Sequence, residues 1–296
     1  MINVARKVAG SFGIHFYRPN PYHLVTDYPV SYEPRYGHKS PPPAAITSLI
    51  EEGREEYRSF LTAVAAMKPL TDTIGFEPDA NPEQPYWNSG WLPPRDGVAM
   101  MHFLMKLKPK RFLEIGSGNS TKFARLAIRH AGLSTIITSI DPEPRAEIDQ
   151  ICDRVVRSGL QDVDLSVFDQ LEAGDILSFD GSHRVFTDSD VTVFFLEVVP
   201  RLPAGVIIQV HDIFWPMDYP AQWGRRYYSE QYLLGMLLVA ARSKIKILLA
   251  NAFIDQDPEL AAIAAPLLPN DPARMARFGE GVWANAFWFE LKEAII

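Results

Sequence analysis

The sequence has one cysteine, Cys152, among 296 residues. A single thiol cannot build an internal disulfide framework or a cysteine-rich zinc site, so a reducing, cytoplasmic setting is expected. Excess positive charge is also lacking, because 29 Lys and Arg residues stand against 36 Asp and Glu residues, a formal net charge of −7. That balance argues against general binding to nucleic-acid phosphates and against electrostatic docking on anionic membranes.

Long apolar runs are missing as well. No uninterrupted apolar stretch reaches about 18 residues, so no membrane span is expected. The N-terminal segment MINVARKVAGSFGIHF has early basic residues but no extended apolar run, so a secretory signal is not expected. With 47% hydrophobic and 22% charged residues, the chain can nevertheless bury a core.

The N-terminal part differs in composition from the rest. Thirteen of the 24 prolines lie in residues 1–94, and seven aromatic residues lie in 12–36. We therefore predict an extension over 1–86 that packs on the core or on a partner subunit of a homo-oligomer. One helix is expected after Pro43, because apolar residues recur at helical spacing from Ile46 to Val64.

From residue 95 onward, short apolar runs alternate with helical patterns, which predicts a parallel α/β sheet over 87–296. Strands are expected at 111–115, 135–140, 154–158, 175–179, 205–210, 245–250 and 285–291. Helices are expected at 98–107, 120–131, 144–151, 163–171, 190–202 and 228–241. No obvious helix separates the last two strands, so the final strand is predicted to be antiparallel and to lie at the sheet edge.

A glycine turn follows the first of these strands, in the segment EIGSGNST (114–121). Such a turn exposes backbone N–H groups and a helix N-terminus to a ligand. A dinucleotide fingerprint would need glycine where Thr121 stands. Glu114 would also repel a diphosphate, whereas it would attract a cofactor that carries an ammonium and a sulfonium group. A tight turn without a ligand is the alternative.

Asp141 ends the second strand, 23 residues after Gly118. An acid about 20 residues beyond a glycine turn is the usual partner of ribose hydroxyls. A helix cap before Pro142 is the local alternative.

These features resemble the class I S-adenosylmethionine-dependent methyltransferases, which have a Rossmann-like seven-stranded sheet with a late antiparallel strand. The resemblance covers about residues 88–296 and rests on EIGSGNST, the acid of SIDPEP and the strand order. It implies S-adenosylmethionine as cofactor. A further likeness of LQDV (160–163) to catechol-type O-methyltransferases implies contacts near the adenine. The cofactor-binding residues expected on this basis are Glu114, Gly116, Ser117, Gly118, Asn119, Asp141, Gln161, Asp162 and Asp180.

A second group of polar residues follows the fourth and fifth strands, as DGSH (180–183) and HD (211–212). The pairing is similar to the macrocin-type and cephalosporin-hydroxylase-like branch, in which acids at these places hold a divalent metal. The likeness implies Asp180, His211 and Asp212 as ligands, although an imidazole suits zinc, iron or manganese better than magnesium. The alternative without a metal gives Asp180, His183 and His211 catalytic roles, with a histidine as general base.

The loop 214–232 is rich in aromatic residues and is expected to cover an acceptor site, or simply to pack. The expected activity is therefore O-methylation of a small-molecule hydroxyl of sugar or natural-product type. A catalytically silent binding protein and an NAD-linked oxidoreductase are the alternatives from other classes.

Overall fold

The computed structural model describes residues 33–267 and 284–296. Of these, residues 34–267 and 284–296 belong to one compact unit. The aromatic residues predicted to pack from Phe12 to Tyr32 lie outside the described residues. None of the helices in the described ranges is both long and apolar enough to cross a membrane.

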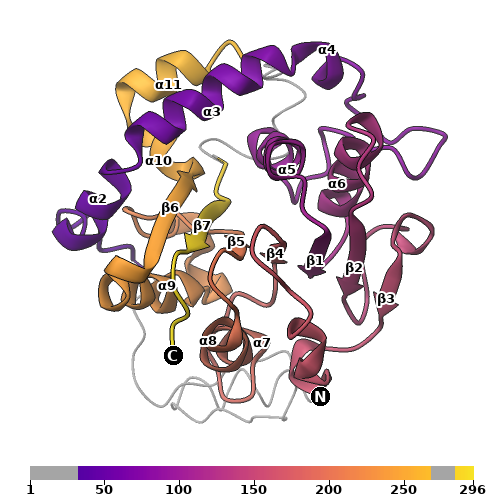
Figure 1. Ribbon diagram of the computed structural model, residues 1–296. Coiled ribbons are helices and arrows are strands. Elements are labelled where there is room, and N and C mark those ends of the chain that lie inside the picture. The colour runs from indigo at the N-terminus through magenta and orange to yellow at the C-terminus, as the bar shows by residue number, and fades with distance from the viewer. Residues whose placement is uncertain (1–32, 268–283) are drawn as a thin grey trace, which may run out of the picture. The chain divides into compact units, whose positions relative to one another are not determined.

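In the described part of the chain, a seven-stranded sheet has the order β3-β2-β1-β4-β5-β7-β6 (Figure 1). Strands β1 to β5 pair in parallel, and β7 pairs antiparallel with both β5 and β6. The strands are β1 (Arg111–Ile115), β2 (Ile136–Ile140), β3 (Arg154–Val156), β4 (Ile176–Phe179), β5 (Ile207–Val210), β6 (Ile245–Ala250) and β7 (Phe287–Leu291). The predicted Rossmann-like sheet with a late antiparallel strand is confirmed.

The predicted edge position of the last strand is wrong, because β7 lies between β5 and β6. Phe287, Trp288 and Phe289 on β7 are all fully buried, as expected for an interior strand with both faces covered. Strand β6 is the edge strand, and its Lys246 points to solvent. Burial of the aromatic strand thus explains why it does not occupy the edge.

Helices cover both faces of the sheet, with α5 and α6 on one face and α7 to α9 on the other (Figure 1). Their bounds are α5 (Pro94–Leu107), α6 (Asn119–His130), α7 (Asp190–Val193), α8 (Val199–Arg201), α9 (Glu230–Ala240), α10 (Asn251–Gln256) and α11 (Pro258–Ala264). A π-helical turn at Phe194–Val198 joins α7 to α8, so residues 190–201 form a continuous helical segment, as predicted.

Two predicted helices are largely absent. The segment 144–151 is helical only at Asp149–Ile151, and 163–171 only at Leu165–Phe168, both as short 3₁₀ turns. In the first segment, Pro142 and Pro144 cannot donate backbone hydrogen bonds and they bias the preceding residues toward extended backbone, which prevents an α-helix from starting there.

The predicted N-terminal helix is in fact two helices, α2 (Ala44–Glu51) and α3 (Arg54–Ala66), which are followed by the short helix α4 (Lys68–Thr71). The chain breaks at Gly53, where a Cβ atom would lie 2.6 Å from the Tyr57 hydroxyl. That buried hydroxyl donates a hydrogen bond to the carbonyl oxygen of Ile50, 2.8 Å away. The tyrosine therefore fills the space that a side chain at residue 53 would occupy.

The described part of the predicted extension packs on the core. Helix α3 contacts α5 and β6, and α2 contacts α9. Near its start, the backbone N–H groups of Arg35 and Tyr36 donate to the Asp218 carboxylate over 2.7 and 2.9 Å. Residues 34–86 thus belong to the same unit as the sheet, and contact with a partner subunit stays a prediction.

Candidate active site

The glycine turn after β1 brings the first and fourth strands together. Gly116 has φ +77°, a left-handed conformation that favours glycine. A Cβ at this position would lie 1.8 Å from the carbonyl oxygen of Asp180, so no side chain fits without a backbone shift. Glycine at 116 therefore lets the end of β1 approach the residue that follows β4.

Glu114 lies beneath this turn rather than in the cavity above it. Its side chain is fully buried, and one carboxylate oxygen accepts a hydrogen bond from the Thr121 hydroxyl. The same hydroxyl accepts a 3.1 Å hydrogen bond from the Gly118 N–H. Burial raises the pKa of Glu114 to about 8. The threonine that replaces the dinucleotide-type glycine thus connects the buried acid to the turn.

Asp141 holds the turn from the neighbouring strand. One of its oxygens accepts a hydrogen bond from the Ser117 N–H at 2.7 Å. The other accepts from the Glu143 N–H at 2.8 Å, which forms a local turn instead of a helix cap. The carboxylate is half-buried and lines a cavity, so it contacts both the glycine turn and the space where a ligand would lie.

That cavity has a volume of about 410 Å³, within the range of about 300–1,000 Å³ typical of ligand sites. Its lining includes five of the nine residues expected to bind the cofactor, namely Gly116, Ser117, Asp141, Gln161 and Asp180. Four expected residues do not line this cavity, and Gly118 among them is the N-cap residue of α6. Glu114 is beneath the turn, the Asn119 amide donates to the Tyr86 carbonyl oxygen at 2.9 Å, and Asp162 is exposed on a 3₁₀ turn.

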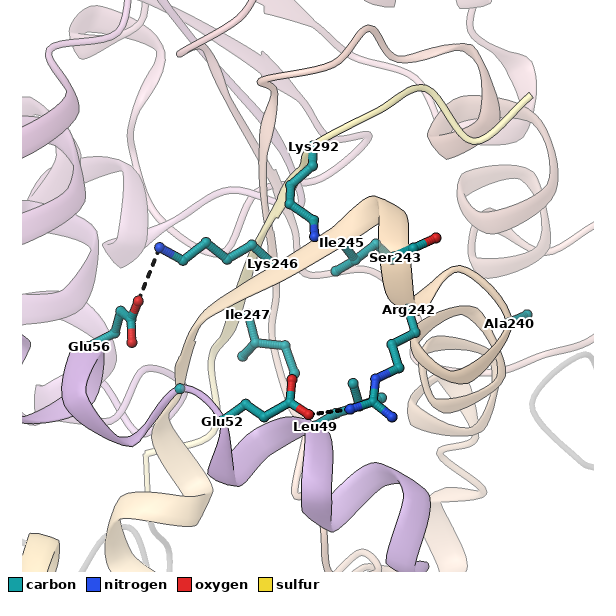
Figure 2. A pocket seen from close by; sticks show the side chains of 11 residues that line it. Leu49, Glu52, Glu56, Ala240, Arg242, Ser243, Ile245, Lys246, Ile247 and Lys292 are labelled. Atoms are coloured by element: carbon teal, nitrogen blue, oxygen red, sulfur yellow. Dashed lines mark hydrogen bonds and ion pairs between the residues drawn. The ribbon is translucent and has the colours of Figure 1, made fainter.

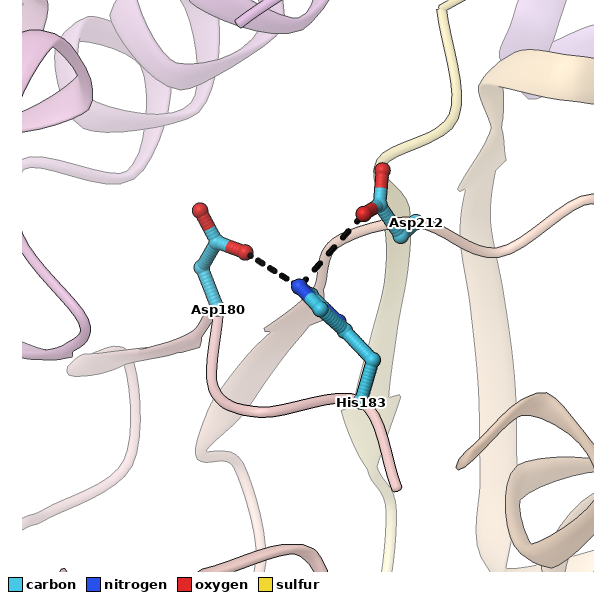
Figure 3. Close-up of side chains that lie close together, drawn as sticks. All are labelled: Asp180, His183 and Asp212. Atoms are coloured by element: carbon cyan, nitrogen blue, oxygen red, sulfur yellow. Dashed lines mark ion pairs between the residues drawn. The ribbon is translucent and has the colours of Figure 1, made fainter. Parts of the chain in front are cut away.

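A cluster of two aspartates and two histidines lies at the ends of β4 and β5. The Nε2 atom of His183 is 3.2 Å from Asp180 Oδ1 and 3.4 Å from Asp212 Oδ2 (Figure 3). The Nδ1 atom of His211 is 3.6 Å from Asp180 Oδ1 and 3.4 Å from Asp212 Oδ1. The structure therefore brings together all four residues that the sequence singled out. We call them the acid–histidine cluster.

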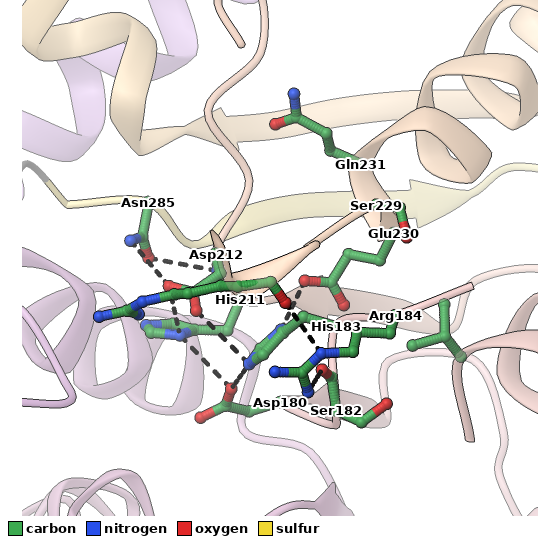
Figure 4. Close-up of polar contacts among 12 residues, drawn as sticks. Asp180, Ser182, His183, Arg184, His211, Asp212, Ser229, Glu230, Gln231 and Asn285 are labelled. Carbon is green, nitrogen blue, oxygen red and sulfur yellow. Dashed lines mark hydrogen bonds and ion pairs between the residues drawn. The ribbon is translucent and has the colours of Figure 1, made fainter. Parts of the chain in front are cut away.

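Each histidine of this cluster has a buried carboxylate behind its ring. The Glu230 carboxylate is 2.5 Å from His183 Nδ1, so the opposite nitrogen is directed at the two aspartates (Figure 4). The Asp96 carboxylate is 3.4 Å from His211 Nε2. A carboxylate behind an imidazole fixes the ring orientation and makes its other nitrogen a stronger base or ligand.

The second aspartate is fixed by the last strand. The Asn285 side-chain amide donates to Asp212 Oδ1 at 2.9 Å, while the Asn285 N–H donates to the Asp96 carboxylate at 2.9 Å. His183 and Asp212 have positive φ angles of 63° and 56°, a conformation that costs free energy for residues other than glycine. The surrounding contacts thus hold two residues of the cluster in strained backbone conformations.

The electrostatics of the cluster favour bound positive charge. Burial would lower the pKa of His183, but Glu230 and Asp212 outweigh it and raise the pKa well above its usual value. Burial acts likewise on His211, and Asp180 and Asp212 raise its pKa. For Asp180, burial raises the pKa, yet the two histidines hold it well below the usual range. The aspartates therefore stabilise a proton or another cation between them.

A second, smaller cavity of about 100 Å³ adjoins the cluster. Its lining includes His183, His211, Asp212 and the aromatic side chains of Trp91, Trp223 and Tyr228. Asp180 and Arg145 line this cavity and the larger one, so the two cavities adjoin at these residues. The predicted covering loop 214–232 supplies two of these aromatic walls. Trp223 is also buried against Phe214, so the loop packs and lines the cavity at once.

Another hollow lies between α2 and β6, where β6 begins (Figure 2). Two of its three basic residues are paired, with Arg242 bonded to Glu52 and Lys246 3.0 Å from Glu56. None of the residues predicted to be functional lines it, so it contributes nothing to the site described above.

Three residues of the site were missed in the sequence, namely Asp96, Glu230 and Asn285. Asp96 and Glu230 lie in the first turns of α5 and α9, where an acid is ordinary. Asn285 lies just before β7. Only the tertiary fold brings these positions next to the histidines, so no local signal could have identified them.

Comparison with known proteins agrees with this geometry. Residues 113–213 match the model of a family described as a methyltransferase domain. This segment begins in β1 and ends just after β5, so it contains the glycine turn and the acid–histidine cluster. No protein of curated function matches the chain.

Several solved structures resemble the chain at low sequence identity. The S-adenosylhomocysteine-bound methyltransferase PaMTH1 of Podospora anserina is 14% identical, with 85% of this chain and 89% of that chain covered and a TM-score of 0.40. An O-methyltransferase of Bacillus cereus is 14% identical, with 83% and 100% covered and a TM-score of 0.39. The O-methyltransferase TomG of Streptomyces achromogenes is 14% identical, with 78% and 89% covered and a TM-score of 0.36.

The sheet with its late antiparallel strand defines a Rossmann-like methyltransferase fold. The family match covers residues 113–213 of the 296-residue chain and shows a methyltransferase domain in that part. A methyltransferase domain favours methyl transfer over the NAD-linked and non-catalytic alternatives.

Proposed function

We propose that the protein transfers a methyl group from S-adenosylmethionine to a hydroxyl oxygen of a small molecule. The observation that carries this proposal is the position of Asp180, which lines both the larger cavity and the smaller one. The larger cavity would hold the cofactor beside the glycine turn. The smaller cavity would bring an acceptor hydroxyl against the acid–histidine cluster, next to the cofactor methyl group.

In this proposal, the chain's own residues align the reactants and remove one proton. The hydroxyl proton passes to the cluster, and the oxygen forms a bond to the methyl carbon while the carbon–sulfur bond breaks. The electron pair of that bond stays on sulfur, which yields S-adenosylhomocysteine. Alignment of oxygen, carbon and sulfur by the two adjoining cavities contributes much of the rate.

The donor set of the cluster also fits a divalent cation. Ligand atoms of Asp180, His183 and Asp212 lie within 4.8 Å of one another. Two ligands bound about 2.1 Å from one ion would lie about 3.0–3.4 Å apart, close to the separations of 3.2 and 3.4 Å found here. Mixed imidazole and carboxylate ligands suit zinc, manganese or iron better than magnesium. When bound, such an ion would lower the pKa of the acceptor hydroxyl.

Proton release distinguishes the metal from a histidine base. The acids around both imidazoles raise their pKa values, so an ion that binds there competes with protons. Calorimetry with Zn²⁺ or Mn²⁺ in buffers of different ionisation enthalpy should show proton release, and a chelator should abolish turnover. Activity that is insensitive to chelator, with no release of protons, would assign His183 the role of general base instead.

Cofactor binding is tested separately with S-adenosylhomocysteine. Replacing Asp141 by alanine removes a lining carboxylate and the acceptor of the Ser117 N–H, so binding should weaken by about 1–3 kcal/mol. Replacing Asp162, which is exposed and does not line the cavity, serves as the matched control. Equal affinity of wild type and the Asp141 variant in calorimetry would contradict the assignment of Asp141.

A further inference from the structure

The smaller cavity has acidic and histidine side chains at its inner end and a guanidinium group at its outer end. Its inner end is formed by the acid–histidine cluster, where Asp212 and His183 are buried. Its outer part is formed by the exposed indole of Trp91 and by the half-buried side chain of Arg226. An acceptor that enters would therefore meet acids and histidines at one end and a guanidinium at the other.

Arg226 is placed by stacking rather than by an ion pair. Its guanidinium carbon lies 4.1 Å from the ring centre of Trp223 and 5.6 Å from that of Tyr228. Within the described residues, the guanidinium makes no hydrogen bond and no salt bridge. Stacking uses the face of the guanidinium and leaves its in-plane N–H groups available for a planar anion.

Three neighbouring arginines differ from Arg226 in their contacts or position. Arg184 also stacks on Tyr228, 5.3 Å from its ring centre, but its N–H groups donate to the carbonyl oxygens of Ser182 and Arg226. Arg225 is exposed and does not line the cavity. Arg145 also stacks, 4.3 Å from the ring centre of Trp91, and also makes no hydrogen bond or salt bridge with a described residue, but it lines both cavities. Among these four arginines, Arg226 lines the smaller cavity and not the larger one, and its guanidinium bonds to no described residue.

The volume of the cavity limits the part of the acceptor that enters. A cavity of about 100 Å³ is smaller than the roughly 150 Å³ that encloses a benzene molecule. Only the edge of a ring that carries the reacting hydroxyl therefore fits between the aromatic walls, and the outer end of the molecule lies toward Arg226. A substituent at that outer end can reach the in-plane donors of Arg226.

We propose that the acceptor is a small ring compound that carries an oxyanion, a carboxylate or a phosphate, and that Arg226 binds this group at the outer end of the smaller cavity. The inference rests on the proposed function, because the cluster must receive the hydroxyl. It adds the charge of the acceptor and the residue that selects it. Guanidinium binds carboxylate and phosphate alike through paired N–H donors.

The test uses hydroxylated probes on one ring: 3- and 4-hydroxybenzoate, 4-hydroxyphenyl phosphate and the neutral 4-hydroxybenzamide. Binding to the protein saturated with S-adenosylhomocysteine is measured by calorimetry, and methylation is followed by S-adenosylhomocysteine formation. At least one anionic probe should bind tenfold or more tightly than the amide. The carboxylate and phosphate arms show which oxyanion is preferred.

Arg226→Gln should reduce the preference for the anionic probe to within about twofold, while affinity for S-adenosylhomocysteine stays unchanged. Arg225→Gln is the matched control and should keep the full preference. The proposal is overturned if the amide binds as well as every anionic probe, if no probe binds, or if the preference survives Arg226→Gln. If the proposed function itself is wrong, the wild-type protein does not bind S-adenosylhomocysteine at all.

Discussion

Substituting alanine for Gly116 tests the contact that joins the two halves of the site. Alanine at φ +77° costs about 1–2 kcal/mol in backbone energy. Its Cβ would also lie 1.8 Å from the Asp180 carbonyl oxygen, so the ends of β1 and β4 must separate by more than 1 Å to reach a normal contact of about 3 Å. Such overpacking costs about 1–3 kcal/mol more.

The expected loss is therefore about 2–5 kcal/mol, a large share of the roughly 5–15 kcal/mol of a typical domain. Urea unfolding followed by circular dichroism should show a midpoint lowered by about 1 M or more. Because Asp180 lines both cavities, calorimetry should also show weaker binding of S-adenosylhomocysteine.

Gly174→Ala is the matched control for this substitution. Gly174 has φ +87°, yet nothing lies within 4 Å of a Cβ built there, so the variant carries the backbone cost without the collision. It should lose only about 1–2 kcal/mol and should keep the affinity of the wild type for S-adenosylhomocysteine. Equal stability losses in the two variants, with unchanged ligand affinity in both, would refute the reasoning.

Two further predictions concern buried titratable groups. Burial, aided by Lys106, lowers the pKa of His102 to about 4, so the unfolded chain binds a proton that the folded chain refuses as pH falls from about 6.5 to 4. Stability should fall over that window by up to about 3 kcal/mol, and His102→Phe should flatten this part of the curve in pH-dependent urea unfolding. Glu230→Gln should weaken Zn²⁺ or Mn²⁺ binding by about 10–100-fold, because His183 loses the carboxylate behind its ring. An unchanged metal affinity would show that Glu230 does not act through His183.

The local patterns predicted the strands well, because short apolar runs between turns have few other interpretations in an α/β chain. Strands β1 and β6 have the predicted bounds. The helix predicted over 144–151 is largely absent, because Pro144 prevents a helix from starting there although the spacing of the apolar residues is helical. The position of β7 also failed, since strand order depends on which surfaces are buried after folding and leaves no trace in a local pattern.

Part of the candidate site could also be predicted from the sequence. Residues that directly follow strands, such as Asp180 and Asp212, could be placed from the expected sheet because parallel strands end at one edge. Glu230 and Asp96 contact the histidine nitrogens that face away from Asp180 and Asp212. They lie in the first turns of α9 and α5, and the packing of the whole domain decides whether those turns face the site.

The interior position of β7 has a consequence for how the enzyme matures. Until β7 has been synthesised, β5 and β6 lack the strand that lies between them, and each leaves an unpaired edge. Asn285, which holds Asp212 and Asp96, reaches its place only with that same strand. A nascent chain on the ribosome therefore has the glycine turn and both histidines but no completed site. Emergence of the C-terminal strand both closes the sheet and completes the active site, so incomplete chains are aggregation-prone and inactive for the same reason.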